Sequence, residues 1–177
     1  FLLGKFRRKV KSGDTTFVED IVAKASESVI VCATLGGMTS SKYAPLIALE
    51  AILKGKFVCS FFSMPYGFEG AQKTKRAMNA RMQLIVSSNF AVQQNNDRLK
   101  EVESLGLNDI DKPLVGTIKS AMSHKSLVEL ADTKNNDSLQ AYIPEEYRVN
   151  DMPLVWIRSN TYHGISDYER KNIFNLY

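Results

Sequence analysis

The chain has 177 residues, of which 44% are hydrophobic and 10% aromatic, and it carries a formal net charge of +4. This length and composition suit one domain of ordinary size, or one and a half small ones, and exclude global disorder. No apolar stretch approaches the roughly 20 residues of a membrane helix, and the opening "FLLGKF" is too short an apolar core for a secretory signal. The sequence therefore predicts a soluble protein with no transmembrane segment.

The excess of positive charge is local. Five cations crowd into the first dozen residues, namely Lys5, Arg7, Arg8, Lys9 and Lys11. Such an arm can touch phosphates or anionic lipid, but a solvated chain end is the commoner explanation. Because nucleic-acid binding would rest on composition alone, it is the least favoured function.

The cysteines and histidines lack the spacing of a disulfide framework or a metal site. Cys32 and Cys59 both lie in apolar runs, which predicts buried thiols in a reducing, cytoplasmic compartment. His124 and His163 have no acid or thiol at ligand spacing, so we expect surface or capping histidines and no metal.

Helices and strands are predicted to alternate. Thr16 and Glu19 have the spacing of a capping box, and a short amphipathic helix follows them. Residues 28–34 form an apolar, β-branched run that predicts a strand covered on both faces. A helix is expected over 44–55, with a proline in its first turn and a glycine at its end, and a second buried strand over 56–63.

The second half of the chain continues this alternation. The inward face of a third helix is predicted at Ala71, Met78, Met82 and Ile85. A third strand is expected over 89–95, and "NDRL" closes it. A long helix is predicted from about 111 to 132, a polar connection over 133–140, a strand over 153–159, and a terminal helix capped by Ser166 and Glu169.

The order of elements predicts an α/β protein with a doubly wound parallel sheet. In such sheets the loops that leave the carboxyl ends of the strands line the ligand crevice. These loops are residues 35–43, 64–70 and 95–98, and Glu69 lies in the second.

The first of these loops, "LGGMTSSKYAP", has some features of a phosphate site. Glycines leave the backbone N–H groups accessible, hydroxyls add donors, and a helix N-terminus follows. The residues concerned are Gly36, Gly37, Thr39, Ser40, Ser41 and Lys42. The alternative is a glycine-rich turn with an N-capping serine, because the spacing is not that of a P-loop.

The same stretches resemble the FtsZ/tubulin superfamily. "VIVCATLGGMTSSKYAPLIA" is similar, without a gap, to the segment in which a strand ends in GGGTGTG and a helix begins at a proline. "FSMPYGFEGAQK" resembles the bacterial PFxFEGxxR loop, and residues 71–95 reproduce the family's spacing to its NDKL. "DKPLVGTIKSAM" is similar to the start of the family's central helix.

The resemblance covers about residues 2–132 and implies a guanine-nucleotide pocket shared between subunits of a filament. It implies that residues 36–42 hold phosphates, that Pro65 shapes the next loop, and that Glu69 accepts a hydrogen bond from the ribose. It places Lys73 at the family's arginine and Asn96 near the sugar and base. The implied ligand is GTP or GDP, with Mg²⁺ left open as a companion ion.

Several positions depart from the family's pattern. Three signature glycines are replaced by Met38, Ser40 and Lys42, whose side chains crowd a backbone that should lie against phosphate. In the central helix the base-stacking aromatic falls at Ile118, and the positions that should read the guanine edge offer no carboxylate or amide. The family's first glycine loop and its catalytic acids have no clear counterpart; Asp167 and Glu169 suit a capping box as well.

Two functions follow from the resemblance. The first is a divergent GTP-binding protein that assembles head to tail into filaments in cell division or the cytoskeleton. Any GTPase activity would be completed across the contact between subunits, and a division or cytoskeletal protein is a possible partner. The alternative is a non-catalytic scaffold or interaction module with a degenerate pocket. The expected domains are residues 1–132, a partial GTPase domain that lacks the first strands, and 133–177, a short C-terminal extension.

Overall fold

The structure is a computed structural model that describes residues 15–99, 109–124, 143, 145, 148–149 and 152–159. The predicted connection at 133–140, the terminal helix, His163 and the acids Asp167 and Glu169 lie outside these residues. The elements in chain order are α2 (Thr16–Ala23), β1 (Ser28–Thr34), α3 (Met38–Leu53), β2 (Phe57–Met64), a 3-10 turn η1 (Gly67–Glu69), α4 (Ala71–Val86), β3 (Phe90–Asn95), α5 (Asn96–Leu99), α6 (Lys112–His124), β4 (Arg148–Val149), β5 (Met152–Pro153) and β6 (Val155–Ser159).

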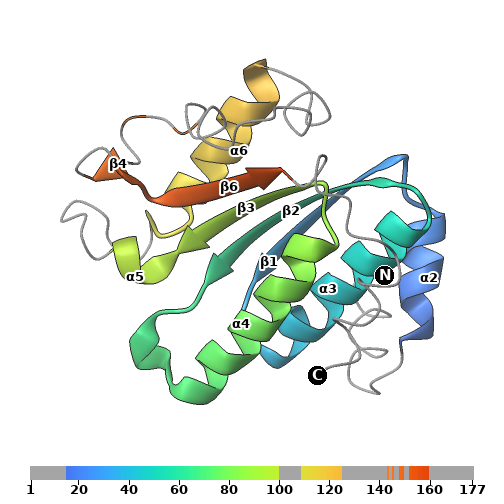
Figure 1. The fold of residues 1–177 in the computed structure, drawn as a ribbon, viewed down its shortest axis with the longest axis horizontal. Helices are drawn as coiled ribbons and strands as arrows, with labels where there is room; N and C mark the ends of the chain where they lie inside the picture. The colour runs from blue at the N-terminus through green and yellow to red at the C-terminus, as the bar shows by residue number, and fades with distance from the viewer. Residues whose placement is uncertain are drawn as a thin grey trace.

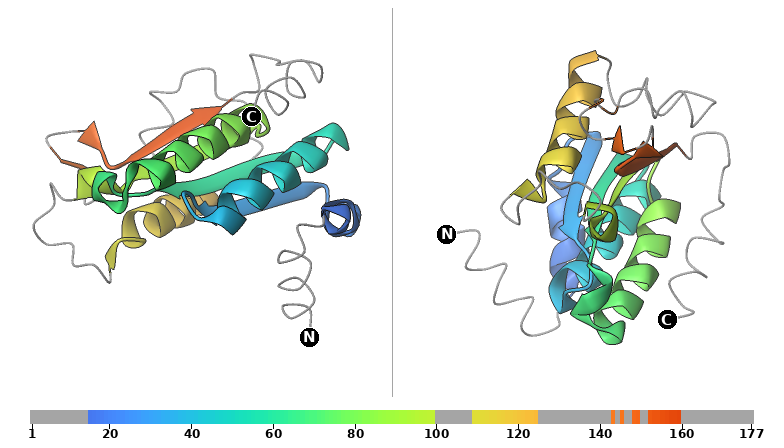
Figure 2. Two further views of the ribbon diagram at one scale, coloured as in Figure 1. Left: turned by 90° about the horizontal axis from the view of Figure 1, so that it is seen from below. Right: turned by 90° about the vertical axis from the view of Figure 1, so that its left-hand side faces the viewer.

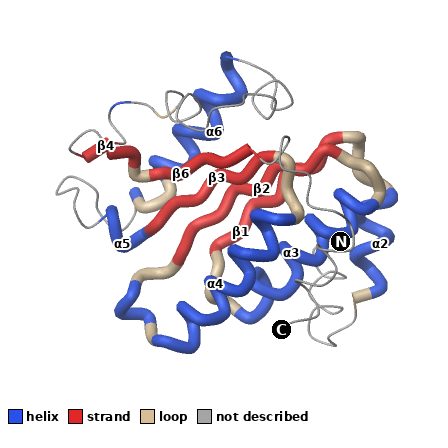
Figure 3. The backbone as a smooth tube through the Cα atoms, viewed as in Figure 1, coloured by secondary structure: helices blue, strands red, loops and turns tan. Residues whose placement is uncertain are grey.

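A four-stranded sheet in the order β1-β2-β3-β6 forms the centre of the fold (Figures 1 and 3). β1, β2 and β3 are parallel, whereas β6 pairs antiparallel with β3 so that Val92 lies opposite Ile157. The expected α/β class and doubly wound arrangement are confirmed, with one antiparallel strand added at the edge. The predicted strand over 153–159 is confirmed for its last five residues.

Helices cover both faces of the sheet (Figure 2). α3 and α4 contact one face, with α2 against α3, while α6 contacts β2, β3 and β6 from the other. β2 is buried on both sides because its side chains alternate: Phe62 joins the cluster beneath α3 and α4, and Phe61 joins the cluster beneath α6. Each fully buried phenylalanine contributes about 1.5–3 kcal/mol to folding.

β1 differs from its prediction. Its burial alternates, and Ile30 is 47% exposed while Val31 is 7% exposed. The cause is its place at the edge of the sheet, where α3 covers one face, while the described part of α6 lies against β2, β3 and β6. The expectation of two covered faces was therefore wrong, and so was a buried Cys32, which is exposed; Cys59, on the central strand, is buried as expected.

The helices also correct details of the prediction. α3 begins at Met38, not near 44, so Pro45 lies inside it rather than in its first turn. In α2, Thr15 and not Thr16 is the N-cap residue. On α4, Met78 and Met82 are each 46% exposed, and Ala71 is also exposed. The expected inward face was thus wrong at three of its four positions, because small residues such as Ala77 and Ala80 face the sheet and allow close packing.

The three parallel strands end on the same side of the sheet, where the loop after β1, the loop with η1, and α5 come together (Figure 1). α6 begins at Lys112 and is described to His124, within the predicted 111–132. Among the described residues, no helix has the length and apolar character to cross a membrane.

Candidate functional site

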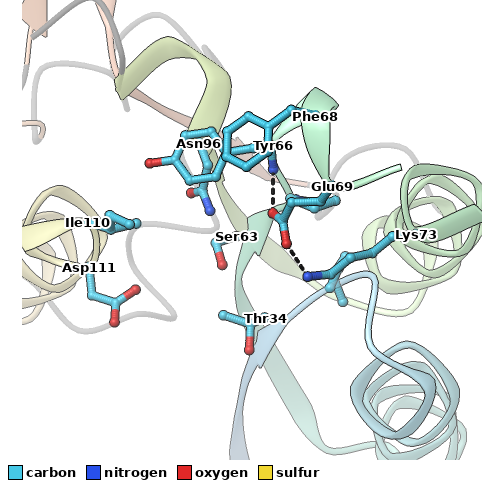
Figure 4. Close-up of a pocket in the computed structure, with 11 residues that line it drawn as sticks. Thr34, Ser63, Tyr66, Phe68, Glu69, Lys73, Asn96, Ile110 and Asp111 are labelled. Carbon is cyan, nitrogen blue, oxygen red and sulfur yellow. Dashed lines mark hydrogen bonds and ion pairs between the residues drawn. The ribbon is translucent and has the colours of Figure 1, made fainter. Parts of the chain in front are cut away.

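A cavity of about 430 Å³ opens at the carboxyl ends of β1, β2 and β3 (Figure 4). Its walls come from the strand ends, the loop around η1, the first turn of α4, α5 and the residues before α6. The lining residues are Thr34, Leu35, Ser63, Pro65, Tyr66, Phe68, Glu69, Lys73, Asn96, Ile110 and Asp111. The crevice is therefore where a doubly wound sheet places it.

Glu69 is held in place by two neighbours. The backbone N–H of Tyr66 donates to Glu69 Oε1 at 2.7 Å, and the Lys73 ammonium donates to Oε2 (Figure 4). The hydrogen bond from Lys73, helped by the one from Tyr66, lowers the pKa of the Glu69 carboxyl below its usual value. Glu69 is thus an oriented carboxylate, and each of its oxygens retains lone pairs that can accept from a ligand hydroxyl.

The loop around η1 is tied to α5. The N–H of Gly67 donates to both carboxylate oxygens of Asp97, at 3.1 and 2.9 Å. A Cβ at Gly67 would lie 3.1 Å from Asp97 Oδ2, so a glycine allows this close approach. The rings of Tyr66 and Phe68 stack at 5.0 Å on the cavity rim, and Phe68 is 73% exposed. The loop after β2 and the helix after β3 are therefore joined by hydrogen bonds.

The first glycine loop packs against the start of α4. Gly36 has φ +100°, and a Cβ there would lie 2.6 Å from Lys73 Cγ. Arg76 Nε donates to the Gly36 carbonyl at 3.0 Å. This position requires glycine for both backbone conformation and space, and it fixes Lys73 between the loop and Glu69.

Hydroxyl groups in the same loop bond within the loop. Ser41 Oγ accepts from the Gly36 N–H at 2.8 Å, and the Ser40 hydroxyl donates to the Thr34 carbonyl. Gly37 is the N-cap of α3, whose first turn supplies backbone N–H groups and the positive end of a 16-residue helix. The loop expected over 35–43 is therefore a tight turn followed by a helix end.

The predicted site residues divide between two cavities. Pro65, Glu69, Lys73 and Asn96 line the first. Gly37, Thr39 and Ser40 line a second cavity of about 580 Å³, which runs along the open edge of β1 and is bordered by Met38. Gly36 and Ser41 line neither, and they lie in the turn between the two.

The wall before α6 is held by a buried amide. Gln94 has no exposed surface; its Nε2 donates to the Ile110 carbonyl at 2.8 Å and its Oε1 accepts from the Leu114 N–H at 3.0 Å. This arrangement places Asp111 on the cavity wall. Ile118, by contrast, packs into the hydrophobic cluster beneath α6, so the position of the expected base-stacking residue belongs to the core.

Comparison with known proteins agrees with the fold. The chain is 28% identical over 121 residues to the cell division protein FtsZ of Aquifex aeolicus (strain VF5), a match that covers 64% of this chain and 33% of the relative. It is similar in structure to an FtsZ dimer from M. jannaschii, with a TM-score of 0.54 and 21% identity over 71% of this chain and 38% of the other. CetZ from Methanosaeta thermophila strain DSM 6194 gives a TM-score of 0.53 and 19% identity over 76% and 38% of the two chains. No family model matches the chain.

The chain is similar in sequence to FtsZ over about two thirds of its length and has the fold of the FtsZ/tubulin structures it matches. It spans about a third of the length of the FtsZ it matches. Its sheet places Pro65, Glu69 and Asn96, which the sequence resemblance singles out, around one cavity.

Sequence reasoning missed several residues of this crevice. Thr34 and Ser63 sit at strand ends, and the general rule for parallel sheets was a signal that could have identified them. Asp97 lies within the quoted "NDRL", yet its partner Gly67 is 30 residues away and nothing local reveals the bond. Asp111 was taken only as the start of a helix, although the helix begins beside the crevice.

Proposed function

We propose that this chain is a divergent FtsZ/tubulin-like nucleotide-binding protein that holds GTP or GDP at the carboxyl ends of β1, β2 and β3 and assembles head to tail. The observation that carries this proposal is one cavity that brings together Pro65 and Glu69 from the loop around η1, Lys73 from the first turn of α4 and Asn96 from the start of α5. These are residues that the sequence resemblance singles out.

The side chains fit a sugar and phosphates. The oriented Glu69 carboxylate suits a ribose hydroxyl, and the Asn96 side chain on the opposite wall suits the sugar or base. Phosphates would lie toward the N-terminus of α3, with the Thr39 hydroxyl as a donor and Lys73 as the nearby cation. A nucleotide would therefore span the turn at Gly36 between the two cavities.

The residues of the cavity suit Mg²⁺ and the nucleotide base less well than they suit the sugar and phosphates. Within the part of the chain that the structure describes, no three His, Cys, Asp or Glu side chains gather as metal ligands. Mg²⁺ bound with a nucleotide keeps several waters and needs one or two carboxylates, a role open to Asp111 on the cavity wall. With Ile118 in the core, stacking of the base would fall to Tyr66 and Phe68, which discriminate poorly between purines.

Assembly and cellular role follow from the relatives. The curated relative is named a cell division protein, and one of the similar structures is an FtsZ dimer. Head-to-tail contacts of one chain with the next are heterologous and produce open filaments. The proposed setting is the cytoplasm, in division or the cytoskeleton with a partner protein, and GTP hydrolysis would require acids supplied across the contact.

A second candidate is a scaffold with a degenerate pocket. It is favoured by hydrogen bonds within the glycine loop: Ser41 Oγ accepts from the Gly36 N–H, and the Ser40 hydroxyl donates to the Thr34 carbonyl. These groups are therefore already engaged without a ligand. Met38 is 73% exposed at the very start of α3, where it borders the second cavity. A thioether side chain there would compete with a phosphate for the helix end.

One experiment separates the two. The purified chain is incubated with GTP, GDP or ATP, and bound nucleotide and pelletable polymer are measured on the same sample. Guanine nucleotide in the protein fraction and nucleotide-dependent pelleting would support the first candidate. Binding without polymer would remove the filament, and the absence of both would favour the scaffold.

A matched pair of variants tests the role of Glu69. Glu69→Gln removes the charge that faces the cavity, whereas Glu50→Gln removes it from an equivalent i,i+4 pair with Lys54 on the outer face of α3. Because hydrogen bonds to charged groups contribute about 1.5–3 kcal/mol, we expect Glu69→Gln to weaken nucleotide binding roughly tenfold or more. Equal affinities of the two variants would refute the sugar contact.

A further inference from the structure

β1 lies at the edge of the four-stranded sheet, and only one side of its backbone pairs with a neighbouring strand. At the two ends of this pairing, the N–H of Phe57 donates to the Glu27 carbonyl at 2.8 Å, and the N–H of Leu35 donates to the Ser63 carbonyl at 2.9 Å. Successive residues of a strand direct their backbone groups to opposite sides, so every second residue from Glu27 to Leu35 bonds to β2. The residues between them direct their N–H and C=O groups away from the sheet.

The outward-facing carbonyls near the two ends of β1 already have partners. Serine hydroxyls donate to the carbonyl of Ser28, at 2.9 Å, and to that of Thr34. Between these ends, no group in the described part of the chain bonds to the backbone N–H or C=O of Ile30 or Cys32. A row of such groups on an edge strand is a template for another strand. The middle of β1 thus has two donors and two acceptors with the spacing of a β ladder.

An apolar cavity, the one of about 580 Å³ described above, lies beside this edge. α2 contributes Ile21, which is 40% exposed, and α3 contributes Tyr43 and Ile47. β1 contributes Ile30, which is 47% exposed. Among the described residues that line the cavity, none is charged. Because successive side chains of a strand point to opposite faces, a strand placed beside β1 would direct alternate side chains into this cavity.

We propose that the edge of β1 binds an extended segment of another polypeptide, which adds a further strand to the sheet. Main-chain hydrogen bonds to Ile30 and Cys32 would supply the pairing, and apolar side chains at alternate positions would fill the cavity. A small apolar molecule would leave these backbone groups without partners, which is unfavourable for groups removed from water. A second copy of the chain is less suited, because it would bring its own α2 and α3 beside β1, where Ile21 of α2 already lies.

Two matched peptides test this proposal. The full chain, without nucleotide, is titrated with a fluorescent heptapeptide of alternating valine and threonine with a lysine at each end, and fluorescence anisotropy is recorded. The second peptide carries N-methyl groups on its inner residues, which remove its backbone donors and keep its side chains. We expect saturable binding of the first peptide and at least about tenfold weaker binding of the second. Equal binding of the two, or no binding of either, would overturn the proposal.

Variants of the edge locate the added strand. Ile30→Pro removes the outward N–H, a change that edge strands tolerate, and Ile30→Lys adds a charge that opposes edge pairing. Each is expected to weaken peptide binding at least about tenfold. Val115→Lys, at a similarly exposed apolar position of α6, should change it less than about twofold. Urea unfolding checks that each variant folds. Loss of binding in Ile30→Lys without loss in Ile30→Pro would refute the main-chain pairing.

Amide hydrogen exchange provides a readout at the edge itself. In the parent chain, bound peptide should slow the exchange of the Ile30 and Cys32 amides at least about tenfold and leave that of Val31, which bonds to β2, unchanged. Unchanged exchange at Ile30 with peptide bound would refute strand addition. Protection that rises with protein concentration and persists against excess peptide would assign the edge to a second copy and overturn the proposal.

Discussion

Replacing Gly36 by alanine tests how the glycine loop is packed. Its φ of +100° strains any residue with a side chain, at a cost of roughly 1–2 kcal/mol. The added Cβ would also lie 2.6 Å from Lys73 Cγ and 3.3 Å from the Lys73 carbonyl oxygen. Overpacking of this kind typically costs about 1–3 kcal/mol, so the total expected loss of unfolding free energy is about 2–5 kcal/mol.

Two other glycines serve as matched controls. Gly55 has φ +73° but nothing within 4 Å of its Cβ position, so Gly55→Ala carries the backbone strain without the clash. Gly37 has φ −70° and a distance of 3.4 Å to Ser40 Oγ, so Gly37→Ala should be close to neutral. The change in the unfolded chain is the same in all three and cancels in the comparison.

The assay is urea unfolding of the three variants and the parent chain under the same conditions. We expect Gly36→Ala to lose the most stability, Gly55→Ala about 1 kcal/mol and Gly37→Ala almost none. Adding Lys73→Ala should recover part of the loss in Gly36→Ala, because the nearest clashing atom is removed. A Gly36→Ala variant no less stable than Gly55→Ala would refute the close packing of the loop on α4.

Three further predictions concern other groups. Because the pKa of Glu69 is lowered on folding, its contribution to stability is complete above the unfolded pKa and is lost as pH falls through the folded pKa. In urea unfolding, the parent should exceed Glu69→Gln in stability by less than about 1 kcal/mol, because the ion pair with Lys73 is part-exposed. This difference should vanish on acidification. Thiol labelling should modify Cys32 in the native chain and Cys59 only in denaturant, because burial raises the pKa of the Cys59 thiol to about 12; native labelling of Cys59 would contradict its place in the core. Gln94→Leu removes its hydrogen bonds to the segment before and at the start of α6 and should cost about 2–4 kcal/mol in a denaturant titration, a loss not expected for Gln83→Leu on α4.

Local patterns predicted most of the elements. The β-branched and aromatic runs at 28–34, 56–63 and 89–95 became the three parallel strands with shifts of one residue at most. The start of α3 was misplaced because Met38 and the polar residues after it resemble a loop, while Pro45 imitates a first-turn residue. A proline tolerated inside the helix was not visible in the local pattern.

Features that depend on contacts between residues far apart in the chain could not be predicted from the sequence. The exposure of Ile30 depends on where α6 lies, and α6 covers β2 and β3 instead of β1. The bond from Gly67 to Asp97 and the amide contacts of Gln94 likewise join segments that only the fold brings together. The sequence predicted that Pro65, Glu69, Lys73 and Asn96 belong to one site, and all four line the same cavity. Their roles in nucleotide binding stay predictions.

The antiparallel strand β6 has a consequence for how the chain reaches its native state. β1, β2 and β3 follow one another with a single helix between each pair, so this half can assemble from contacts that are close in sequence. β6 is separated from β3 by α5, α6 and the residues that follow, yet it covers the far side of β3 and completes the cluster that holds Val92. During synthesis on the ribosome, β3 emerges long before β6. Until β6 arrives, β3 is an unpaired edge strand that other nascent chains can pair with. The yield of correctly folded protein is therefore expected to depend on how quickly the last strand arrives.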